Sequence, residues 1–126
     1  MSRRRVVVTG LGIVSPVGVG VDEAWASILA GRSGIGPITR FDASGFPVRI
    51  AGEVKGFDVS KWLSAKESRR YDTFIHYGLV AAMESIRDAG LEGWNGDKER
   101  AGVCIGSGIG TGSTRSPPSI QRPASL

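Results

Sequence analysis

Residues 72–90 read DTFIHYGLVAAMESIRDAG, and this stretch decides the fold. Asp72 stands where a helix-capping residue is preferred, and Ala89-Gly90 stands where helices commonly end. The apolar residues between them recur at helical spacing: Phe74, Ile75, Leu79, Ala82, Met83 and Ile86. The pattern predicts an amphipathic helix that begins after Asp72 and closes at Ala89-Gly90.

Two short apolar runs flank this helix in the sequence. Val6-Val7-Val8 is β-branched and ends at Thr9-Gly10, and residues 101–106 read AGVCIG. Runs of this length and composition are typical of buried strands. A strand, helices and a second strand together predict an α/β protein, without internal repeats.

The residues between the first run and the helix predict smaller elements. Residues 10–18 are rich in turn formers, and Asp22 is expected to cap a short helix that stops at Gly31. Residues 32–47 are rich in Gly, Pro, Ser and Asp and predict a loop, whereas the weak alternation of residues 48–54 predicts an edge strand. The apolar face of the short helix consists of Trp25, Ile28 and Leu29.

A second helix start is marked by a capping box. Ser64 and Glu67 are spaced so that each side chain can satisfy a backbone donor at the other residue. The basic residues that follow at helical spacing are Lys66, Arg69 and Arg70. Most such groups are solvated faces, but the same group can orient an acidic partner, and the residue pattern alone favours the solvated face.

Composition places the chain among ordinary globular proteins. Of its 126 residues, 40% are apolar and 22% charged, which suits one domain with a core. A single cysteine excludes an intramolecular disulfide, and we find neither a signal peptide nor an apolar run of membrane-spanning length. We therefore expect a cytoplasmic protein. A net charge of +4 without interleaved aromatics is weak support for nucleic-acid binding, which we do not expect.

Glycine is abundant, with 19 residues, and raises the question of a dinucleotide site. In that motif three glycines at fixed spacing let backbone N–H groups meet a pyrophosphate. Here Gly10 and Gly12 are followed by Ser15 at the third position, and Gly106 and Gly108 by Thr111. The spacing fails, so a nicotinamide enzyme is the weaker alternative and close backbone packing the better explanation.

Cys104 and His76 are the only residues of their kinds. Cys104 lies between two β-branched residues of the second apolar run, so we expect a buried, inert thiol. His76 has no serine or cysteine near it in sequence and cannot form a zinc site alone. We expect His76 to be a structural or a surface histidine.

Taken in order, the motifs resemble the opening of the β-ketoacyl-[acyl-carrier-protein] synthases of the synthase II type. The resemblance covers residues 3–110 without large gaps. The matching motifs are RRVVVTGLG (4–12), SPVG (15–18), LAGRSGI (29–35), FD (41–42), KE (66–67), Arg69, Asp72, FI (74–75), YG (77–78) and IGSGIG (105–110).

This resemblance implies an incomplete N-terminal half of a thiolase-like fold, which in the family has two similar α/β halves and works as a homodimer. It also implies fatty-acid chain elongation, in which an acyl group held on a cysteine condenses with malonyl-ACP. It implies neither a metal nor a redox cofactor. A polyketide condensing enzyme is the nearest variant, and a non-catalytic fragment that docks the acyl-carrier protein is the alternative from another class.

Residue by residue, the resemblance implies two kinds of site. Such synthases present basic residues to the acidic carrier protein, and these positions coincide with Lys66, Arg69 and Arg70. The resemblance therefore favours a carrier-protein docking site over a merely solvated face. Ile109 resembles an apolar residue that lines the acyl pocket. The family's catalytic cysteine and two histidines lie beyond residue 126, and neither Cys104 nor His76 matches them. We expect the chain alone to be inactive.

The sequence changes character after residue 110. Residues 111–126 have no periodicity and three prolines, so we expect a disordered tail that is separate from the family segment 1–110. In the family, the sequence after the position of residue 110 continues with Gly-Leu. If codons 111–120 are translated in another reading frame, the peptide can also begin with Gly-Leu. We hypothesise that residues 111–126 are out of frame.

Overall fold

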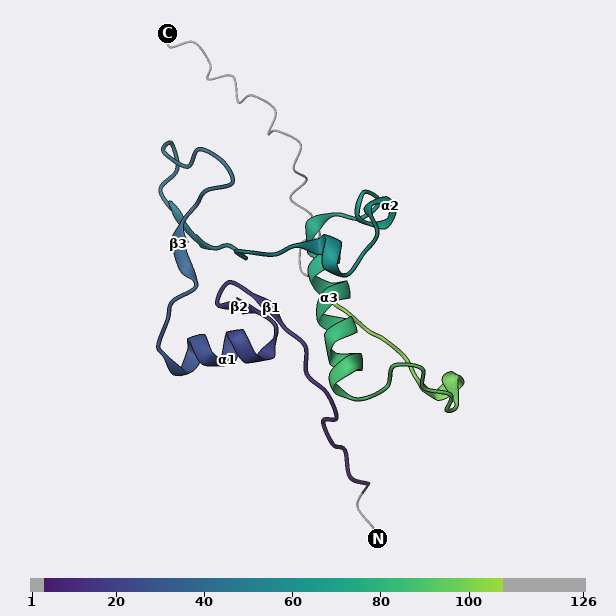
Figure 1. The fold of residues 1–126 in the computed structure, drawn as a ribbon. Coiled ribbons are helices and arrows are strands. Elements are labelled where there is room, and N and C mark those ends of the chain that lie inside the picture. The colour runs from purple at the N-terminus through teal and green to yellow at the C-terminus, as the bar shows by residue number, and fades with distance from the viewer. Residues whose placement is uncertain (1–3, 108–126) are drawn as a thin grey trace.

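The computed structural model describes residues 4–107, and within them it mixes short strands with helices (Figure 1). The longest element is helix α3, which stands beside two small hairpins. The elements in chain order are β1 (Val14–Ser15), β2 (Gly18–Val19), α1 (Val21–Leu29), β3 (Ile35–Pro37), β4 (Ile50–Gly52), η1 (Val59–Lys61), α2 (Ala65–Ser68), α3 (Thr73–Asp88) and η2 (Lys98–Arg100).

The strands form two separate antiparallel pairs. In the first pair Val14 lies opposite Val19, and in the second Ile35 lies opposite Gly52. Strand β4 falls inside the edge strand expected at residues 48–54, which confirms that prediction. Strand β3 falls inside the loop expected at residues 32–47, so that prediction was wrong there, because a strand of three residues is too short to show a period.

Helix α1 begins earlier than its sequence suggested. The carbonyl of Gly20 already accepts the N–H of Ala24 at 3.1 Å, so Gly20 is the N-cap and Asp22 lies in the first turn. The expected cap at Asp22 was therefore wrong. Gly31 follows the helix with a φ of 64°, which confirms the stop. The expected apolar face points to solvent: Trp25, Ile28 and Leu29 are exposed, whereas Ala24 and Ser27 are buried.

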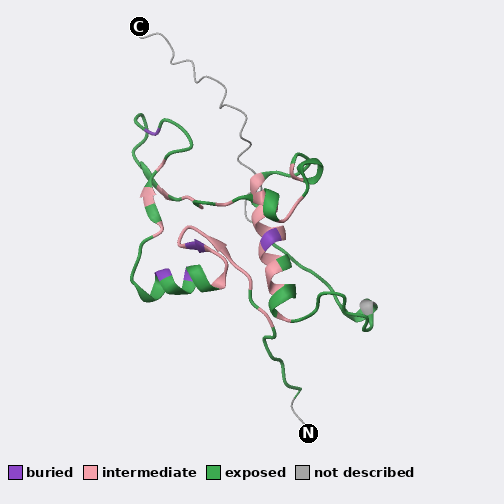
Figure 2. Ribbon diagram, viewed as in Figure 1, coloured by how far each residue is buried: buried purple, intermediate pink, exposed green. Residues whose placement is uncertain are grey.

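Helix α3 matches its prediction at both ends. Asp72 occupies the N-cap, although through its backbone carbonyl rather than its side chain, and Ala89 is the C-cap. Gly90 has a φ of 67°, a conformation that favours glycine. Val80, with no exposed surface, is the most buried residue of the described chain. In Figure 2 the buried parts of the described chain are a few small patches, one of them on α3. None of the described helices has the length and apolar character that crossing a bilayer requires.

The two apolar runs that were expected to be buried strands are neither buried nor strands. Val6 is 92% exposed and Val103 is 76% exposed, and no strand is assigned to residues 6–8 or 101–106. A strand needs a neighbour that takes its N–H and C=O groups. No strand of the described chain lies alongside either run. In Figure 1 the first run extends beyond the end of α3, and the second is an irregular trace that passes beside it.

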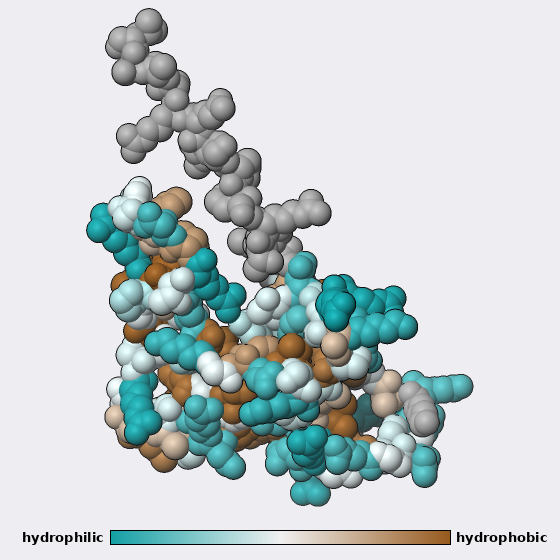
Figure 3. Space-filling model, turned by 45° about the horizontal axis from the view of Figure 1, so that its top comes forward, coloured by the Kyte–Doolittle hydropathy of each residue, from teal (hydrophilic) through white to brown (hydrophobic). Residues whose placement is uncertain are grey.

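The described residues enclose only a small core. Its buried hydrophobic members are Ala24, Ala43 and Val80. Many large apolar side chains remain at the surface, where Figure 3 shows them gathered in the middle of the face between the two hairpins and α3. The mixed α/β character is confirmed, but the described strands form two small hairpins and no central sheet.

Candidate functional site

The basic cluster, defined as Lys66, Arg69 and Arg70, lies on and just after the single turn of α2. The turn begins with the capping box that the sequence predicted. The N–H of Glu67 donates to Ser64 Oγ at 3.3 Å, and the N–H of Ser64 donates to the Glu67 carboxylate at 3.0 Å. The local sequence therefore fixes where this turn starts and which way its side chains point.

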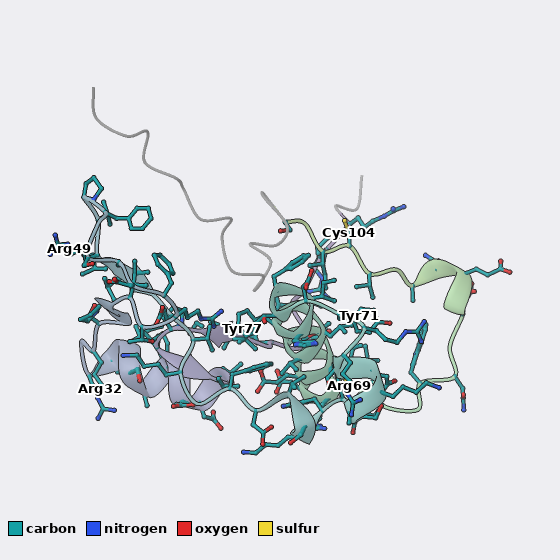
Figure 4. The ribbon with its side chains drawn as sticks, turned by 90° about the horizontal axis from the view of Figure 1, so that it is seen from above. Arg32, Arg49, Arg69, Tyr71, Tyr77 and Cys104 are labelled. Carbon is teal, nitrogen blue, oxygen red and sulfur yellow. The ribbon has the colours of Figure 1, made fainter. Side chains whose placement is uncertain are left out.

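The capping box also engages Glu67, the acidic residue that lies among these basic side chains. Hydrogen bonds from the Ser64 hydroxyl and N–H, together with the positive charge of Arg70, lower the pKa of Glu67 below its ordinary value of 4.5. The carboxylate is thus ionised at neutral pH, and it is engaged at the start of the helix. All three basic side chains are exposed, and Arg69 points away from the helices in Figure 4.

His76 joins the cluster to α3. Its Nε2 lies 2.9 Å from the carbonyl oxygen of Ser68, the last residue of α2, and a protonated Nε2 donates to that oxygen. The contact ties α2 to the first half of α3. His76 therefore contributes to positioning the basic cluster, which favours the structural of the two roles expected for it.

Cys104 is exposed, so the expectation of a buried thiol was wrong. It lies on the irregular segment that passes beside α3, and this segment, α3 and Gly12 line an open groove of about 500 Å³. The groove is lined by small residues of α3, among them Gly78, Ala81 and Ser85. Because no neighbouring strand covers this segment, the thiol faces the groove and solvent. Cys104 and Arg69 lie on opposite sides of α3 in Figure 4.

The structure does not combine Cys104 and His76 into a catalytic pair. His76 bonds to Ser68, whereas Cys104 lies among apolar and small residues of the groove. Within residues 4–107, His, Cys, Asp and Glu side chains form no group of three that could hold a metal ion. Ile109 and residues 111–126 lie outside the described residues.

The glycines of the first segment serve close packing, as their failed dinucleotide spacing indicated. A Cβ on Gly12 would collide with the carbonyl oxygen of Ala81, and a Cβ on Gly10 would collide with that of Ser85. Only glycine lets this backbone lie directly on α3. The segment is therefore occupied by the helix and does not present its N–H groups to a phosphate.

Sequence reasoning missed a contact between the second hairpin and α3. The Arg40 guanidinium donates to the Tyr77 hydroxyl at 2.7 Å, and the Tyr77 ring meets the Phe57 ring edge to face with centroids 4.8 Å apart. Figure 4 shows Tyr77 reaching from α3 toward that hairpin. Arg40 and Tyr77 are 37 positions apart, so no local sequence pattern could predict their hydrogen bond.

Comparison with known proteins gives one consistent result. A family model described as "Beta-ketoacyl synthase, N-terminal domain" matches residues 3–124. The 3-oxoacyl-[acyl-carrier-protein] synthase 2 of Vibrio cholerae is 51% identical over 110 residues, which is 87% of this chain and 27% of that protein. The synthase 2 of Synechocystis is 46% identical over the same length, 87% of this chain and 26% of that protein.

A solved structure shows the same relationship in three dimensions. The ishigamide ketosynthase/chain length factor superposes with a TM-score of 0.61 at 41% identity, over 71% of this chain and 22% of that one. The chain thus spans about a quarter of the length of the curated relatives that it matches.

Proposed function

We propose that this chain, which belongs to the β-ketoacyl synthase family by its N-terminal domain, is part of a 3-oxoacyl-[acyl-carrier-protein] synthase. Such an enzyme condenses an acyl thioester with malonyl-ACP in fatty-acid elongation. The proposal is supported by relatives about 50% identical over 110 residues, each named a 3-oxoacyl-[acyl-carrier-protein] synthase 2. The contribution of this segment is to bind and orient the carrier protein.

The basic cluster carries the docking proposal. Lys66, Arg69 and Arg70 are exposed together on one turn, and Glu67, the acidic residue between them, is hydrogen-bonded to Ser64. A fixed cationic face attracts an acidic partner over several ångströms and sets its orientation before contact. The anchored position of α2 on α3 keeps this face in one place.

The test is binding of acyl-carrier protein to the full chain at low salt, measured by titration calorimetry. We expect Lys66→Glu and Arg69→Glu each to weaken binding about tenfold, because each places a like charge against the acidic partner. Arg32→Glu, at an exposed arginine beyond α1, is the matched control and should retain affinity. Binding that is absent at low salt, or that Arg32→Glu weakens as much, would refute the docking role.

We further propose that the chain has no condensing activity by itself. Cys104 lies in an apolar groove and His76 is engaged by Ser68, so neither is placed for covalent catalysis with the other. The measurement is release of carbon dioxide from malonyl-ACP in the presence of an acyl thioester. Turnover that Cys104→Ser abolishes would overturn this part of the proposal.

Three further parts of the proposal concern the whole enzyme. Ile109 would line the acyl pocket, the enzyme would work as a homodimer, and it would act in the cytoplasm.

We also propose that residues 111–126 are out of frame, although the family match extends to residue 124. Resequencing the gene beyond codon 110 tests this: a frame that continues into a cysteine elbow and two histidines supports it, and an unchanged sequence refutes it.

A further inference from the structure

Tyr71 stands in the bend that joins α2 to α3, directly after the basic cluster, and is 41% exposed. Within the described residues its ring meets no other ring or cation, and its hydroxyl makes no hydrogen bond. The other tyrosine of the chain differs on each point, since Tyr77 packs against Phe57 and accepts a hydrogen bond from Arg40. Tyr71 is thus an exposed aromatic residue without a partner in the described part of the chain.

The backbone around this ring is fixed on both sides. The N–H of Arg70 donates to the carbonyl of Glu67 at 3.0 Å, and the carbonyl of Asp72 accepts the N–H of His76 at 3.2 Å. The imidazole of His76 also lies 2.9 Å from the carbonyl oxygen of Ser68, which links α2 to α3 across the bend. Because tyrosine has only two side-chain torsions as well, presenting this ring to a partner costs little conformational entropy.

The neighbours of Tyr71 place it on the surface of the basic cluster. Arg69 and Arg70 precede it and Asp72 follows it, and all three are exposed. Burying such charged side chains is costly unless they are paired, so the ring between them does not belong to a hydrophobic core. In Figure 4 Tyr71 and Arg69 lie on the same side of α3, away from Tyr77.

We propose that Tyr71 is the apolar anchor of the carrier-protein docking site, and that its ring packs against an apolar side chain bordered by acidic residues on the carrier protein. This inference rests on the proposed docking function. Aromatic residues near the centre of an interface contribute much of the binding energy, whereas exposed charges mainly set the association rate and the orientation. The cations of the basic cluster then face the carboxylates of the partner while the ring covers the apolar contact between them.

The ring also makes the site selective. Exposed cations attract any strongly acidic protein or polymer, because the attraction depends on charge alone. A site that also requires an apolar side chain among the carboxylates discriminates against partners that lack one. Tyr71 therefore determines which acidic partner is retained, and the basic cluster determines how fast the encounter occurs.

The first test compares acyl-carrier protein with poly-aspartate as ligands of the full chain, by titration calorimetry. We expect Tyr71→Ala to weaken binding of the carrier protein about tenfold and to leave binding of poly-aspartate unchanged. Tyr71→Phe should retain the affinity for both ligands because it keeps the ring. Trp25→Ala is the matched control, since Trp25 is an exposed aromatic residue on α1, outside the basic cluster.

The outcomes separate the anchor from the docking function. If the unchanged chain binds the carrier protein and Lys66→Glu weakens binding while Tyr71→Ala does not, docking stands and the anchor is wrong. If the unchanged chain does not bind the carrier protein, docking fails and the anchor fails with it. A loss in Trp25→Ala, or with poly-aspartate, equal to the loss in Tyr71→Ala with the carrier protein would also overturn the proposal.

The second test uses ionic strength to separate the ring from the charges. The Debye length shortens from about 30 Å at 0.01 M salt to about 8 Å at 0.15 M, so the loss of affinity caused by Lys66→Glu should shrink as salt is added. The loss caused by Tyr71→Ala should stay about tenfold, because an apolar contact is not screened. If Tyr71→Ala does not fold, Tyr71→Gln, a polar side chain without the ring, gives the same measurement. Two losses that fall together with added salt would show that Tyr71 is not an apolar anchor.

Discussion

The backbone N–H of Ile13 donates to the carboxylate of Glu84 across 3.0 Å, although the two residues are 71 positions apart. One turn later along α3, Asp88 accepts the N–H of Leu11 at 2.8 Å. Two carboxylates four residues apart on one helix face thus hold alternate N–H groups of the glycine-rich segment. They provide the acceptors that a neighbouring strand would otherwise supply, and so they fix this segment on α3.

Removing the first of these carboxylates should destabilise the chain. Glu84→Ala leaves the half-buried N–H of Ile13 without its acceptor, which costs about 1–3 kcal/mol of unfolding free energy. Urea unfolding followed by tryptophan fluorescence measures the loss. Glu92→Ala is the control, because Glu92 forms only an exposed ion pair with Arg87 and should change stability by less than about 1 kcal/mol. Equal effects would show that Glu84 has no special role.

Adding a methyl group at Gly12 should be more damaging than adding one at Gly45. The new Cβ would collide with the carbonyl oxygen of Ala81, which forces the segment off α3 and costs about 1–3 kcal/mol. Gly45→Ala meets nothing within 4 Å and should be neutral or slightly stabilising. Thermal unfolding of both variants checks the difference, and a neutral Gly12→Ala would contradict the close packing.

Acid should weaken the capping box at the start of α2. The pKa of Glu67 is lower in the folded chain than its ordinary value of 4.5, because Ser64 donates hydrogen bonds to its carboxylate. The stability that it contributes is therefore present above pH 4.5 and is lost as the pH falls through the lower folded value. We expect Ser64→Ala to return the Glu67 pKa toward 4.5 in an NMR titration. An unchanged titration would show that the capping box does not lower the pKa of Glu67.

The contact between Arg40 and Tyr77 should control how tightly the second hairpin is held. Tyr77→Phe removes the acceptor but keeps the ring that meets Phe57, so we expect a loss of about 1 kcal/mol and about fivefold faster tryptic cleavage at Arg40 and Arg49. Tyr71→Phe is the control, since the Tyr71 hydroxyl makes no hydrogen bond within the described part of the chain. If both variants accelerate cleavage equally, the hydrogen bond between Arg40 and Tyr77 does not hold the second hairpin.

Local patterns predicted the helical features well. The span of α3, the capping box at Ser64, and the helix stops at Gly31 and Gly90 all depend on residues within one or two turns of each other. Family membership also followed from the ordered motifs. The basic cluster was identified in the sequence too, although its docking role stays a prediction.

The sequence by itself determined the elements whose stabilising partners lie nearby in the chain, because caps, turns and helical hydrogen bonds close over three or four residues. Only the tertiary structure decided which groups meet across long separations. It left Val6 and Cys104 exposed without a neighbouring strand, brought Tyr77 to Arg40, and set Glu84 against Ile13. A strand forms only where another backbone takes its hydrogen bonds, and a run of valines cannot specify whether that neighbour is present.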